Sequence, residues 1–364
     1  MPKPNKKKIC IVASSLGRGG AEKSSAMLSI MLSELGYEVY IVTVLNYIDY
    51  EYKGTLLNLG ELKPKKDTAF DRMNRLKFFK NFIDAHHIDV IIDARVRIRP
   101  YLEIIVKNFI YKKPVLYVIH NYKTKKAFTP YACLNKFLYK NETMITVSKA
   151  AEEKFRTLFQ LNTITTVYNA FDFEAIETAS KQSIDFIIGP YIIFYGRLDD
   201  EHKNLRLLFD AYKLSGLPEK NIKLLVLGNG PDEVKLKDYA LRMKLENSIV
   251  FKGFEKNPYP YVKQSLFLVL SSRYEGFPMV IPEALSLNVP VVSVDCKSGP
   301  NEVIYNAHNG LLVENHNPEA LAKAMRRFCE DEDLFLNCKS NAKASVAQFS
   351  KSKIAQQWQH LLNS

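Results

Sequence analysis

The residues best suited to chemistry lie in one stretch of the sequence, residues 271–284. The stretch follows an apolar run that predicts a buried strand, and it leads into a predicted helix. Glu275 lies just before this helix, where a sugar ring would lie, and Glu283 lies in its first turns, where a carboxylate can accept both hydrogen bonds of a ribose diol. Four residues between them should present backbone N–H groups at the positive end of the helix, which favours phosphate or sugar hydroxyls: Gly276, Phe277, Pro278 and Met279.

Two cations follow an earlier predicted strand. Arg197 comes directly after the apolar run at residues 191–195, and Lys203 lies about one helical turn into the next segment. Ligands of open parallel sheets bind outside the carboxyl ends of the strands. Both side chains are therefore suited to a diphosphate, for which charge-assisted hydrogen bonds are the strong contacts. Solvated surface cations are the alternative for this pair.

The first predicted strand, residues 8–13, runs into a loop that contains Gly19 and Gly20. Such glycines permit a tight turn and bring a helix N-terminus toward a ligand. The loop is not a full GxGxxG, and the second predicted strand ends in Val44 without the acidic residue of a dinucleotide site. An acceptor or phosphate loop is favoured over NAD binding, with a simple tight turn as the alternative.

Short β-branched runs alternate with longer amphipathic stretches along the chain, the pattern of parallel sheets covered by helices on both faces. The first half predicts strands at residues 8–13, 38–44, 90–93, 115–119, 143–147 and 164–168. The second half predicts strands at residues 191–195, 223–227, 248–251, 266–270, 289–294 and 310–313. We expect an α/β protein with two similar halves.

The length of 364 residues exceeds what one hydrophobic core usually fills, which favours two domains. A polar segment that ends in Gly189-Pro190 predicts the boundary near residue 185, between domains at 1–185 and 186–364. A final amphipathic helix is predicted around Ile354, Trp358 and Leu361.

In order along the chain, these segments resemble retaining GT-B glycosyltransferases, close to glycosyltransferase family 4 (glycosyl transferases group 1). The Glu275 to Glu283 spacing resembles the family's Glu-x7-Glu signature. The likeness covers nearly the whole chain, and further matching segments lie at residues 19–20, 147–150, 168–172, 196–198, 203–204, 227–231 and 251–254.

The resemblance implies a GT-B fold, in which two Rossmann-like, doubly wound domains face a central cleft and the last helix crosses back to the first domain. It implies that the first domain binds the acceptor and the second the nucleotide sugar. Arg197 and Lys203 would neutralise the donor diphosphate, and Glu283 would bind the ribose. Glu275 and the backbone of residues 276–279 would hold the transferred sugar.

Three further positions take roles from the same resemblance. Gly253 and Phe254 belong to a segment that would line the base of the nucleotide. His120 ends a first-domain strand and resembles the family's sugar-facing histidine, although a structural histidine is the alternative. No metal and no cofactor is expected, and the DxD-like Asp331-Glu332-Asp333 lies in a charged helical region that predicts solvated surface.

The segment at residues 298–302 resembles family members that act on polysaccharide, lipopolysaccharide or lipid-linked oligosaccharide precursors. We therefore expect transfer of a hexose or N-acetylhexosamine from a UDP-linked sugar to a cell-envelope glycan or lipid-linked acceptor, with retention of configuration. A GT-B sugar-nucleotide epimerase and a dinucleotide-dependent oxidoreductase are the enzyme alternatives. A basic nucleic-acid-binding protein is the other class, but it gives no role to Glu275 and Glu283.

The cysteines and the lengths of the apolar runs indicate where the protein is located. The five cysteines form no CxxC pair, which indicates a reducing compartment. The apolar run at residues 9–13 is too short for a signal peptide, and no run approaches the ~18 residues of a membrane span. We expect a cytoplasmic protein.

The net charge is +12, and residues 1–190 carry 29 basic and 19 acidic side chains. This excess predicts docking of the first domain on an anionic membrane surface, with a solvated basic face as the alternative. Eleven basic residues face one acid, Glu103, in the densest segment: Arg95, Arg97, Arg99, Lys107, Lys112, Lys113, Lys123, Lys125, Lys126, Lys136 and Lys140. A preceding predicted helix adds Arg72, Arg75, Lys77 and Lys80, interleaved with aromatic residues.

Overall fold

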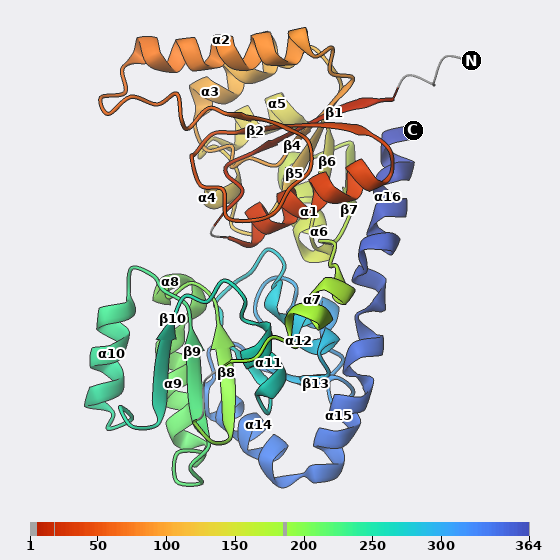
Figure 1. Ribbon diagram of the computed structural model, residues 1–364. Coiled ribbons are helices and arrows are strands. Elements are labelled where there is room, and N and C mark those ends of the chain that lie inside the picture. Colours follow the sequence, from red (N-terminus) through yellow and green to blue (C-terminus); the bar gives the residue numbers. More distant parts are fainter. Residues whose placement is uncertain (1–5, 18, 185–187, 364) are drawn as a thin grey trace. The chain divides into compact units, whose positions relative to one another are not determined.

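A computed structural model describes residues 6–17, 19–184 and 188–363 (Figure 1). The chain divides into two compact units. Unit 1 comprises Met1–Ala170 and Lys351–Ser364, and unit 2 comprises Phe171–Ser350. The boundary expected near residue 185 falls on residues outside the described part of the chain, and the division between the units comes earlier, after Ala170.

Unit 1 is built on a seven-stranded parallel sheet with the order β3-β2-β1-β4-β5-β6-β7. The apolar runs form strands because a parallel sheet covered on both faces buries nearly every strand residue. The strands are β1 (Lys8–Ala13), β2 (Glu38–Thr43), β3 (Thr55–Asn58), β4 (Val90–Asp93), β5 (Val115–Ile119), β6 (Thr143–Thr146) and β7 (Thr163–Thr166). Strand β3 was not predicted from the sequence; it is a four-residue strand at the edge of the sheet with only Asn58 buried.

Helices cover both faces of this sheet (Figure 1). They are α1 (Gly20–Glu34), α2 (Ala69–Ala85), α3 (Pro100–Ile105), the π-helix η1 (Val106–Ile110), α4 (Thr124–Ala127), α5 (Ala132–Tyr139), α6 (Lys149–Phe159) and α16 (Lys351–Asn363). A capping box between Thr68 and Asp71 starts α2, and the Ser148 hydroxyl caps α6.

The final helix α16 completes unit 1. It buries Ile354, Trp358 and Leu362. Lys351 forms an ion pair with Glu34 of α1 at 3.0 Å. The last helix therefore belongs to the same compact unit as the first strand, although the two are at opposite ends of the sequence.

Unit 2 repeats the pattern with a six-stranded parallel sheet of order β10-β9-β8-β11-β12-β13. Its strands are β8 (Tyr191–Tyr195), β9 (Lys223–Leu227), β10 (Ile249–Gly253), β11 (Leu268–Leu270), β12 (Val291–Val294) and β13 (Gly310–Val313). Its helices are α7 (Phe173–Ala179), α8 (Asp200–Lys203), α9 (Leu205–Leu214), α10 (Glu233–Arg242), α11 (Tyr259–Gln264), α12 (Val280–Ser286), α13 (Pro300–Val303), α14 (Pro318–Glu330), α15 (Glu332–Ser345) and the 3₁₀-helix η2 (Ala347–Phe349).

Each unit has its own hydrophobic core. In unit 1, Phe128, Phe155 and Phe159 are fully buried, and Phe128 packs edge-on against Phe159 at 4.8 Å between ring centroids. In unit 2, α9 and α14 pack on the sheet through residues such as Phe209 and Met325. The expected α/β fold of two Rossmann-like domains is therefore confirmed.

Candidate active site

The expected site residues of unit 2 follow strands that meet at one edge of its sheet. Strand β8 pairs with β9 on one side and with β11 on the other. From β8 to β10 the strands are added on one side of β8, and from β11 to β13 they are added on its other side. The boundary between β8 and β11 is therefore the point where the strand order reverses. Ligands of open α/β sheets bind at such a switch point, outside the carboxyl ends of the strands. Arg197 follows β8, and Glu275 lies in the loop after β11.

Lys203 and Glu275 form a buried ion pair at this edge. The Lys203 ammonium lies 2.7 Å from Oε1 of Glu275, and the two side chains are 14% and 7% exposed. The other carboxylate oxygen lies 3.6 Å from Nε2 of His202, whose ring stacks on Tyr274. Burial favours the neutral acid, but Lys203 and His202 outweigh it and hold the pKa of Glu275 well below its usual range.

Backbone contacts fix this pair in place. The Ser271 hydroxyl donates to the carbonyl of Lys203 at 2.9 Å, and the backbone N–H of Arg273 donates to the carbonyl of His202 at 2.9 Å. The N–H of Glu275 donates to the carbonyl of Lys297 at 2.7 Å. The end of α8 and the loop after β11 are thereby tied together.

Arg197 lies in the loop after β8, and its side chain is exposed. The loop after β9 packs directly on this loop, because Leu198 donates its N–H to the carbonyl of Asn229 at 2.9 Å. Gly228 has a positive φ of 135°, and a Cβ there would collide with the carbonyl oxygen of Gly196. Gly228 is thus required for the close approach that shapes the Arg197 loop.

Glu283 lies on α12 and is 3% exposed. The Tyr195 hydroxyl donates to Oε2 of Glu283 at 2.8 Å and lies 3.1 Å from the carbonyl oxygen of Val280. Tyr195 ends β8, so the strand that leads to Arg197 also orients the glutamate expected to bind ribose. Burial and the neighbouring Glu283 carboxylate raise the pKa of Tyr195 well above its ordinary value, which keeps its proton on the hydroxyl.

The four residues before α12 are mostly covered. The Phe277 ring packs against Phe171 and Phe349 at 6.3 and 5.4 Å between centroids, so this side chain belongs to the core of unit 2. The backbone of Gly276, Phe277, Pro278 and Met279 leads directly into the helix at Val280. Near the end of β10, Gly253 has open space around it and Phe254 is 60% exposed, as a surface for a nucleotide base requires.

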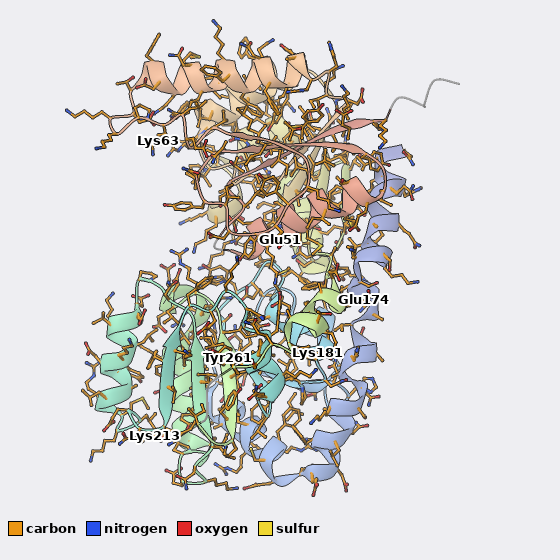
Figure 2. The ribbon with its side chains drawn as sticks, viewed as in Figure 1. Glu51, Lys63, Glu174, Lys181, Lys213 and Tyr261 are labelled. Atoms are coloured by element: carbon orange, nitrogen blue, oxygen red, sulfur yellow. The ribbon has the colours of Figure 1, made fainter. Side chains whose placement is uncertain are left out.

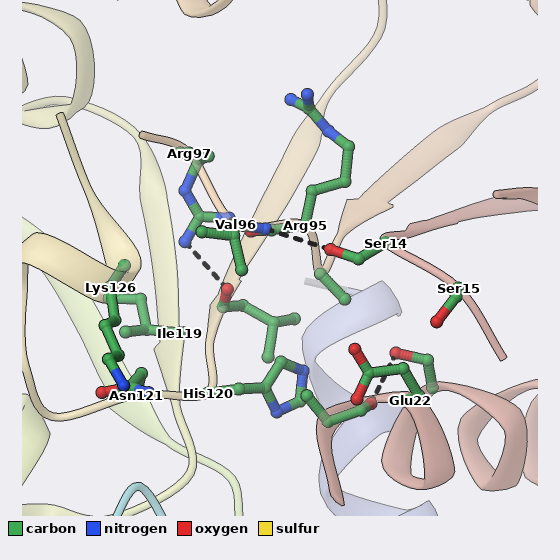
Figure 3. Close-up of a pocket in the computed structure, with 15 residues that line it drawn as sticks. Ser14, Ser15, Glu22, Arg95, Val96, Arg97, Ile119, His120, Asn121 and Lys126 are labelled. Carbon is green, nitrogen blue, oxygen red and sulfur yellow. Dashed lines mark hydrogen bonds between the residues drawn. The ribbon is translucent and has the colours of Figure 1, made fainter. Parts of the chain in front are cut away.

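His120 lies in unit 1, in a pocket at the carboxyl ends of β1, β4 and β5 (Figure 3). This is the switch point of the first sheet, because β1 pairs with both β2 and β4. Figure 3 shows the imidazole of His120 and the carboxylate of Glu22 directed into the same space. Hydroxyl and amide groups of Ser14, Ser15 and Asn121 also line the pocket.

The charge of His120 is governed by burial. Its Nε2 atom is buried and, among the described residues, has no hydrogen-bond partner. Desolvation, followed by the positive charge of Arg97, lowers the pKa of His120 to about 4. The imidazole is therefore uncharged at neutral pH, with one nitrogen able to donate and the other to accept.

The glycine loop precedes α1 in the same unit. Gly19 is the N-cap residue and Gly20 the first residue of the helix. Glu22, in the first helical turn, folds its carboxylate back over Gly19, where a Cβ would collide with it. Arg18 lies outside the described residues. The chain thus places a carboxylate of its own beside the helix N-terminus that the sequence suggested for a phosphate.

The DxD-like segment has a structural place. The Asp331 side chain accepts a hydrogen bond from the N–H of Leu334 and caps α15, and it lies 3.4 Å from Arg327. Across the described part of the chain, no group of three or more His, Cys, Asp or Glu side chains is arranged to hold a metal ion.

Three residues at these sites were not predicted from the sequence: His202, Tyr195 and Glu22. His202 is adjacent to Lys203, and Tyr195 closes the strand before Arg197, so their positions in the sequence were available signals. The partners of His202 and Tyr195 could not be predicted from position, because Glu275 and Glu283 lie 72 or more residues further along the chain.

The sequence of this chain is similar to those of known glycosyltransferases. Residues 180–345 match the family model described as Glycosyl transferases group 1. The chain is 29% identical, over 96% of its length and 97% of the relative, to the N-acetylgalactosamine-N,N'-diacetylbacillosaminyl-diphospho-undecaprenol 4-alpha-N-acetylgalactosaminyltransferase of Campylobacter jejuni. It is 36% identical to the lipopolysaccharide 1,6-galactosyltransferase of Escherichia coli, over 34% of each chain.

Solved structures extend the likeness to both units. A mutant of S. aureus TarM in complex with Fondaparinux, alpha-GlcNAc-glycerol and UDP superposes with a TM-score of 0.78 at 16% identity, over 98% of this chain and 100% of TarM. Anabaena HepE in complex with UDP and glucose has a TM-score of 0.78 at 20% identity, over 98% and 99%. The chain therefore has the GT-B fold, and residues 180–345 carry the sequence pattern of the glycosyl transferases group 1.

Proposed function

We propose that this protein is a retaining, metal-independent glycosyltransferase. It moves a hexose or N-acetylhexosamine from a UDP-linked sugar to a cell-envelope glycan or lipid-linked acceptor. The observation that carries this proposal is the buried Lys203 and Glu275 pair at the switch point of unit 2, with Glu283 oriented by Tyr195 at the same edge of the sheet. Two relatives are named for action on lipopolysaccharide and on a diphospho-undecaprenol-linked sugar. These names support a cell-envelope glycan or a lipid-linked sugar as the acceptor.

Unit 2 is the donor-binding part of this proposal. Glu283 binds the ribose diol, and Gly253 and Phe254 border the base. Arg197 and Lys203 face the diphosphate. Glu275 and the backbone of residues 276–279 hold the transferred sugar. Glu275 is held in its ionised form, so it accepts hydrogen bonds from sugar hydroxyls and does not donate.

The reaction breaks the bond between the sugar and the phosphate. Negative charge grows on the leaving diphosphate, and the sugar becomes oxocarbenium-like, so preorganised cations do most of the work. Arg197 and Lys203 supply them. The attack takes place on the face of the sugar that the diphosphate leaves, and the departing phosphate helps to deprotonate the acceptor hydroxyl.

Unit 1 is the acceptor-binding part. Its pocket contains His120, Glu22 and several hydroxyl groups, a lining suited to sugar hydroxyls. Gly19 and Gly20 shape the loop beside it. We assign the domain roles as expected from the sequence, with the boundary at Ala170 in place of residue 185: unit 1, which includes α16, binds the acceptor, and unit 2 binds the nucleotide sugar.

A peripheral location on the cytoplasmic face of the cell membrane completes the proposal. No helix within residues 6–17, 19–184 and 188–363 has the length and apolar character needed to cross a bilayer. Helix α2 exposes Phe70, Met73 and Phe78 (73%, 56% and 56% exposed), and Figure 2 shows Lys63 extending outward from the loop ahead of α2. Exposed aromatic and basic side chains together favour an anionic lipid surface.

Nucleotide binding tests the proposal directly. The ligands for a thermal-shift measurement are UDP, GDP and ADP, the sugar conjugates of these three nucleotides, and NAD. The largest stabilisation should be seen with the UDP compounds. A ligand at 100 times its Kd adds about 2.7 kcal/mol. Glu283→Ala should remove most of the UDP response, because it leaves the ribose diol unpaired. Glu319→Ala, an exposed acid in the first turn of α14, is the matched control and should respond like the parent. No response to any nucleotide would refute the donor assignment.

The products test the reaction. Release of UDP only in the presence of an acceptor separates transfer from epimerisation. The anomeric configuration of the new linkage, read from NMR couplings, should match that of the donor. An inverted linkage would refute the retaining mechanism and leave the donor site standing.

A further inference from the structure

Within the described part of unit 1, Arg97 is the most deeply buried cation, with 1% of its surface exposed. Its Nη1 donates to the carbonyls of Asp93 and Arg95 at 3.1 and 3.0 Å. Its Nη2 donates to the carbonyl of Val118 at 2.8 Å. One guanidinium thus joins the end of β4, the segment after it, and β5.

These hydrogen bonds lie beside the pocket that contains His120. Val118 precedes His120 by two residues, and both Arg97 and His120 line the pocket (Figure 3). The backbone N–H of Arg97 donates to the carbonyl of Ala127, and the rings of Tyr117 and Phe128 lie 5.7 and 5.4 Å from the guanidinium carbon. The planar fork is held from several sides, so it fixes where β5 ends.

Among the described residues, no carboxylate forms an ion pair with Arg97. Asp93 is engaged by Arg95, whose Nε and Nη2 lie 3.0 and 2.7 Å from its two oxygens. Arg95 also reaches Glu103 at 3.3 Å. The guanidinium of Arg97 is hydrogen-bonded to carbonyl oxygens and faced by aromatic rings, and the nearby charge of Asp93 compensates it without a direct ion pair. Burying such a charge is costly and is weak evidence for a purely stabilising role.

We propose that Arg97 is a positioning residue for the transfer reaction: it fixes the carboxyl end of β5 and thereby presents the imidazole of His120 to a hydroxyl of the bound sugar. The inference rests on the proposed function for its consequence in catalysis. The contact between Arg97 and the strand that carries His120 stands without it.

The charge of Arg97 has a second effect on the same imidazole. Burial is the larger cause of the low pKa of His120, and Arg97 adds to it. The other charged groups around the pocket are Glu22 on α1, Arg95 after β4 and Lys126 on α4, and Tyr168 lines the neighbouring pocket that His120 also borders. An uncharged imidazole both donates and accepts, which matches a sugar hydroxyl; an imidazolium only donates.

NMR titration of His120 in the free protein tests this role without any substrate. Arg97→Met keeps much of the side-chain volume and removes the charge and the fork. The pKa of His120 should rise from about 4 toward its ordinary 6.5 and stay below it, because burial remains. Arg97→Lys keeps the charge without the planar fork. Its His120 pKa should stay near that of the parent, while the NMR signals of β5 shift and kcat falls about tenfold or more with little change in the KM for the donor.

Lys53→Met is the control, since Lys53 is an exposed cation of the same unit and lies outside the pocket. It should leave the His120 pKa, the β5 signals and kcat unchanged. A His120 pKa and β5 signals in Arg97→Met equal to those of the parent would overturn the proposal. If Arg97→Met fails to fold, parent-like β5 signals and kcat in Arg97→Lys would overturn it instead. Absence of any transfer activity in the parent would count against the proposed function only, because the titration and the β5 signals need no substrate.

Discussion

At the scale of single residues, Lys203 and Arg197 are two cations with different surroundings. Lys203 is committed to Glu275 at 2.7 Å, and its side chain passes within 3.9 Å of the position of a Cβ on Gly196. Arg197 is exposed on the loop beside it. Both are assigned to the diphosphate, but only Lys203 also compensates a buried carboxylate.

This difference separates catalysis from stability. Arg197→Ala and Lys203→Ala should each lower kcat/KM about 100-fold, from the loss of roughly 2 to 4 kcal/mol of transition-state stabilisation. Only Lys203→Ala should also lower the free energy of unfolding, by roughly 3 to 5 kcal/mol, because it leaves Glu275 buried and unpaired. Denaturant unfolding and steady-state kinetics measure the two effects.

Two further variants sharpen that test. Lys203→Ala combined with Glu275→Gln removes both charges and should recover part of the stability without recovering activity. Lys213→Ala, an exposed lysine of unit 2 labelled in Figure 2, should change neither quantity. Near-normal turnover in both Arg197→Ala and Lys203→Ala would reject their assignment to the diphosphate.

The pH dependence of stability is a second residue-scale prediction. The folded-state pKa of His120 lies near 4, below its ordinary 6.5, so between these values the unfolded chain binds a proton that the folded chain does not. Stability is therefore lost as the pH falls through this window. The lowered pKa of Glu275 acts in the same direction, below the ordinary 4.5 of a glutamate.

His120→Asn should remove the first contribution. Its Tm should fall less than that of the parent between pH 7.5 and pH 5, as measured by calorimetry. His360→Asn, an exposed histidine on α16 in the same unit, should show the full decrease of the parent. Equal decreases in His120→Asn and the parent would contradict a buried, uncharged His120.

At the scale of elements, the loops at the carboxyl ends of the unit 2 strands form one packed assembly. The N–H of Gly196 donates to the carbonyl of Leu227, and the N–H of Gly228 donates to the carbonyl of Gly253, at 3.0 and 2.6 Å. These bonds link the loops after β8 and β9 to the end of β10. The shape of the proposed donor site therefore depends also on Gly196, Leu227 and Gly228, to which no ligand contact is assigned.

Gly228→Ala tests this dependence. The added Cβ would collide with the carbonyl oxygen of Gly196, so the Arg197 loop must move and UDP should bind at least about tenfold more weakly, a loss of roughly 1.4 kcal/mol. Gly216→Ala is the control, because Gly216 also has a positive φ of 72° but its nearest neighbour is 4.0 Å away. It should cost only backbone strain, about 1 to 2 kcal/mol of stability, and leave UDP affinity intact. Calorimetric titration with UDP distinguishes the two.

At the scale of the whole molecule, the basic charge of unit 1 is less available than its sequence indicates. Arg97 is buried, the Arg95 side chain is 10% exposed and paired with Asp93, and Lys107 is paired with Glu142. These three of the eleven cations in residues 95–140 do not form an open basic surface. Lys112, Lys113 and Lys125 are exposed and remain as candidates for contact with lipid.

Binding to vesicles tests these lysines. The protein should sediment with vesicles that contain phosphatidylserine at low salt, and recovery should fall as salt is added. Changing Lys112, Lys113 and Lys125 to Glu should weaken binding, at about 1 kcal/mol for each basic residue lost near anionic lipid. The same charge change at Lys213, Lys235 and Lys256 of unit 2 should have little effect. Equal recovery with neutral and anionic vesicles would leave a soluble acceptor as the better interpretation.

The strands that carry the site, and the order of the loops after them, could be predicted from residue patterns along the chain. Strands β1, β4, β5, β8, β9 and β13 begin and end where the apolar runs predicted, because strands buried on both faces leave a continuous apolar signal. Strand β3 was missed because only Asn58 of its four residues is buried, so the strand carries a weak version of that signal. The candidate residues of the donor site could likewise be named, since each follows a strand at a recognisable spacing.

Which of those residues meet depends on how the chain folds in three dimensions. Lys203 pairs with Glu275, Tyr195 with Glu283, and Arg97 with the carbonyls of β4 and β5, because the order of strands in the sheets brings distant loops to one edge. The same packing buries Arg97 and leaves only 10% of the Arg95 side chain exposed. Burial and partner depend on contacts between segments far apart in the chain, and no local pattern of residue types encodes them.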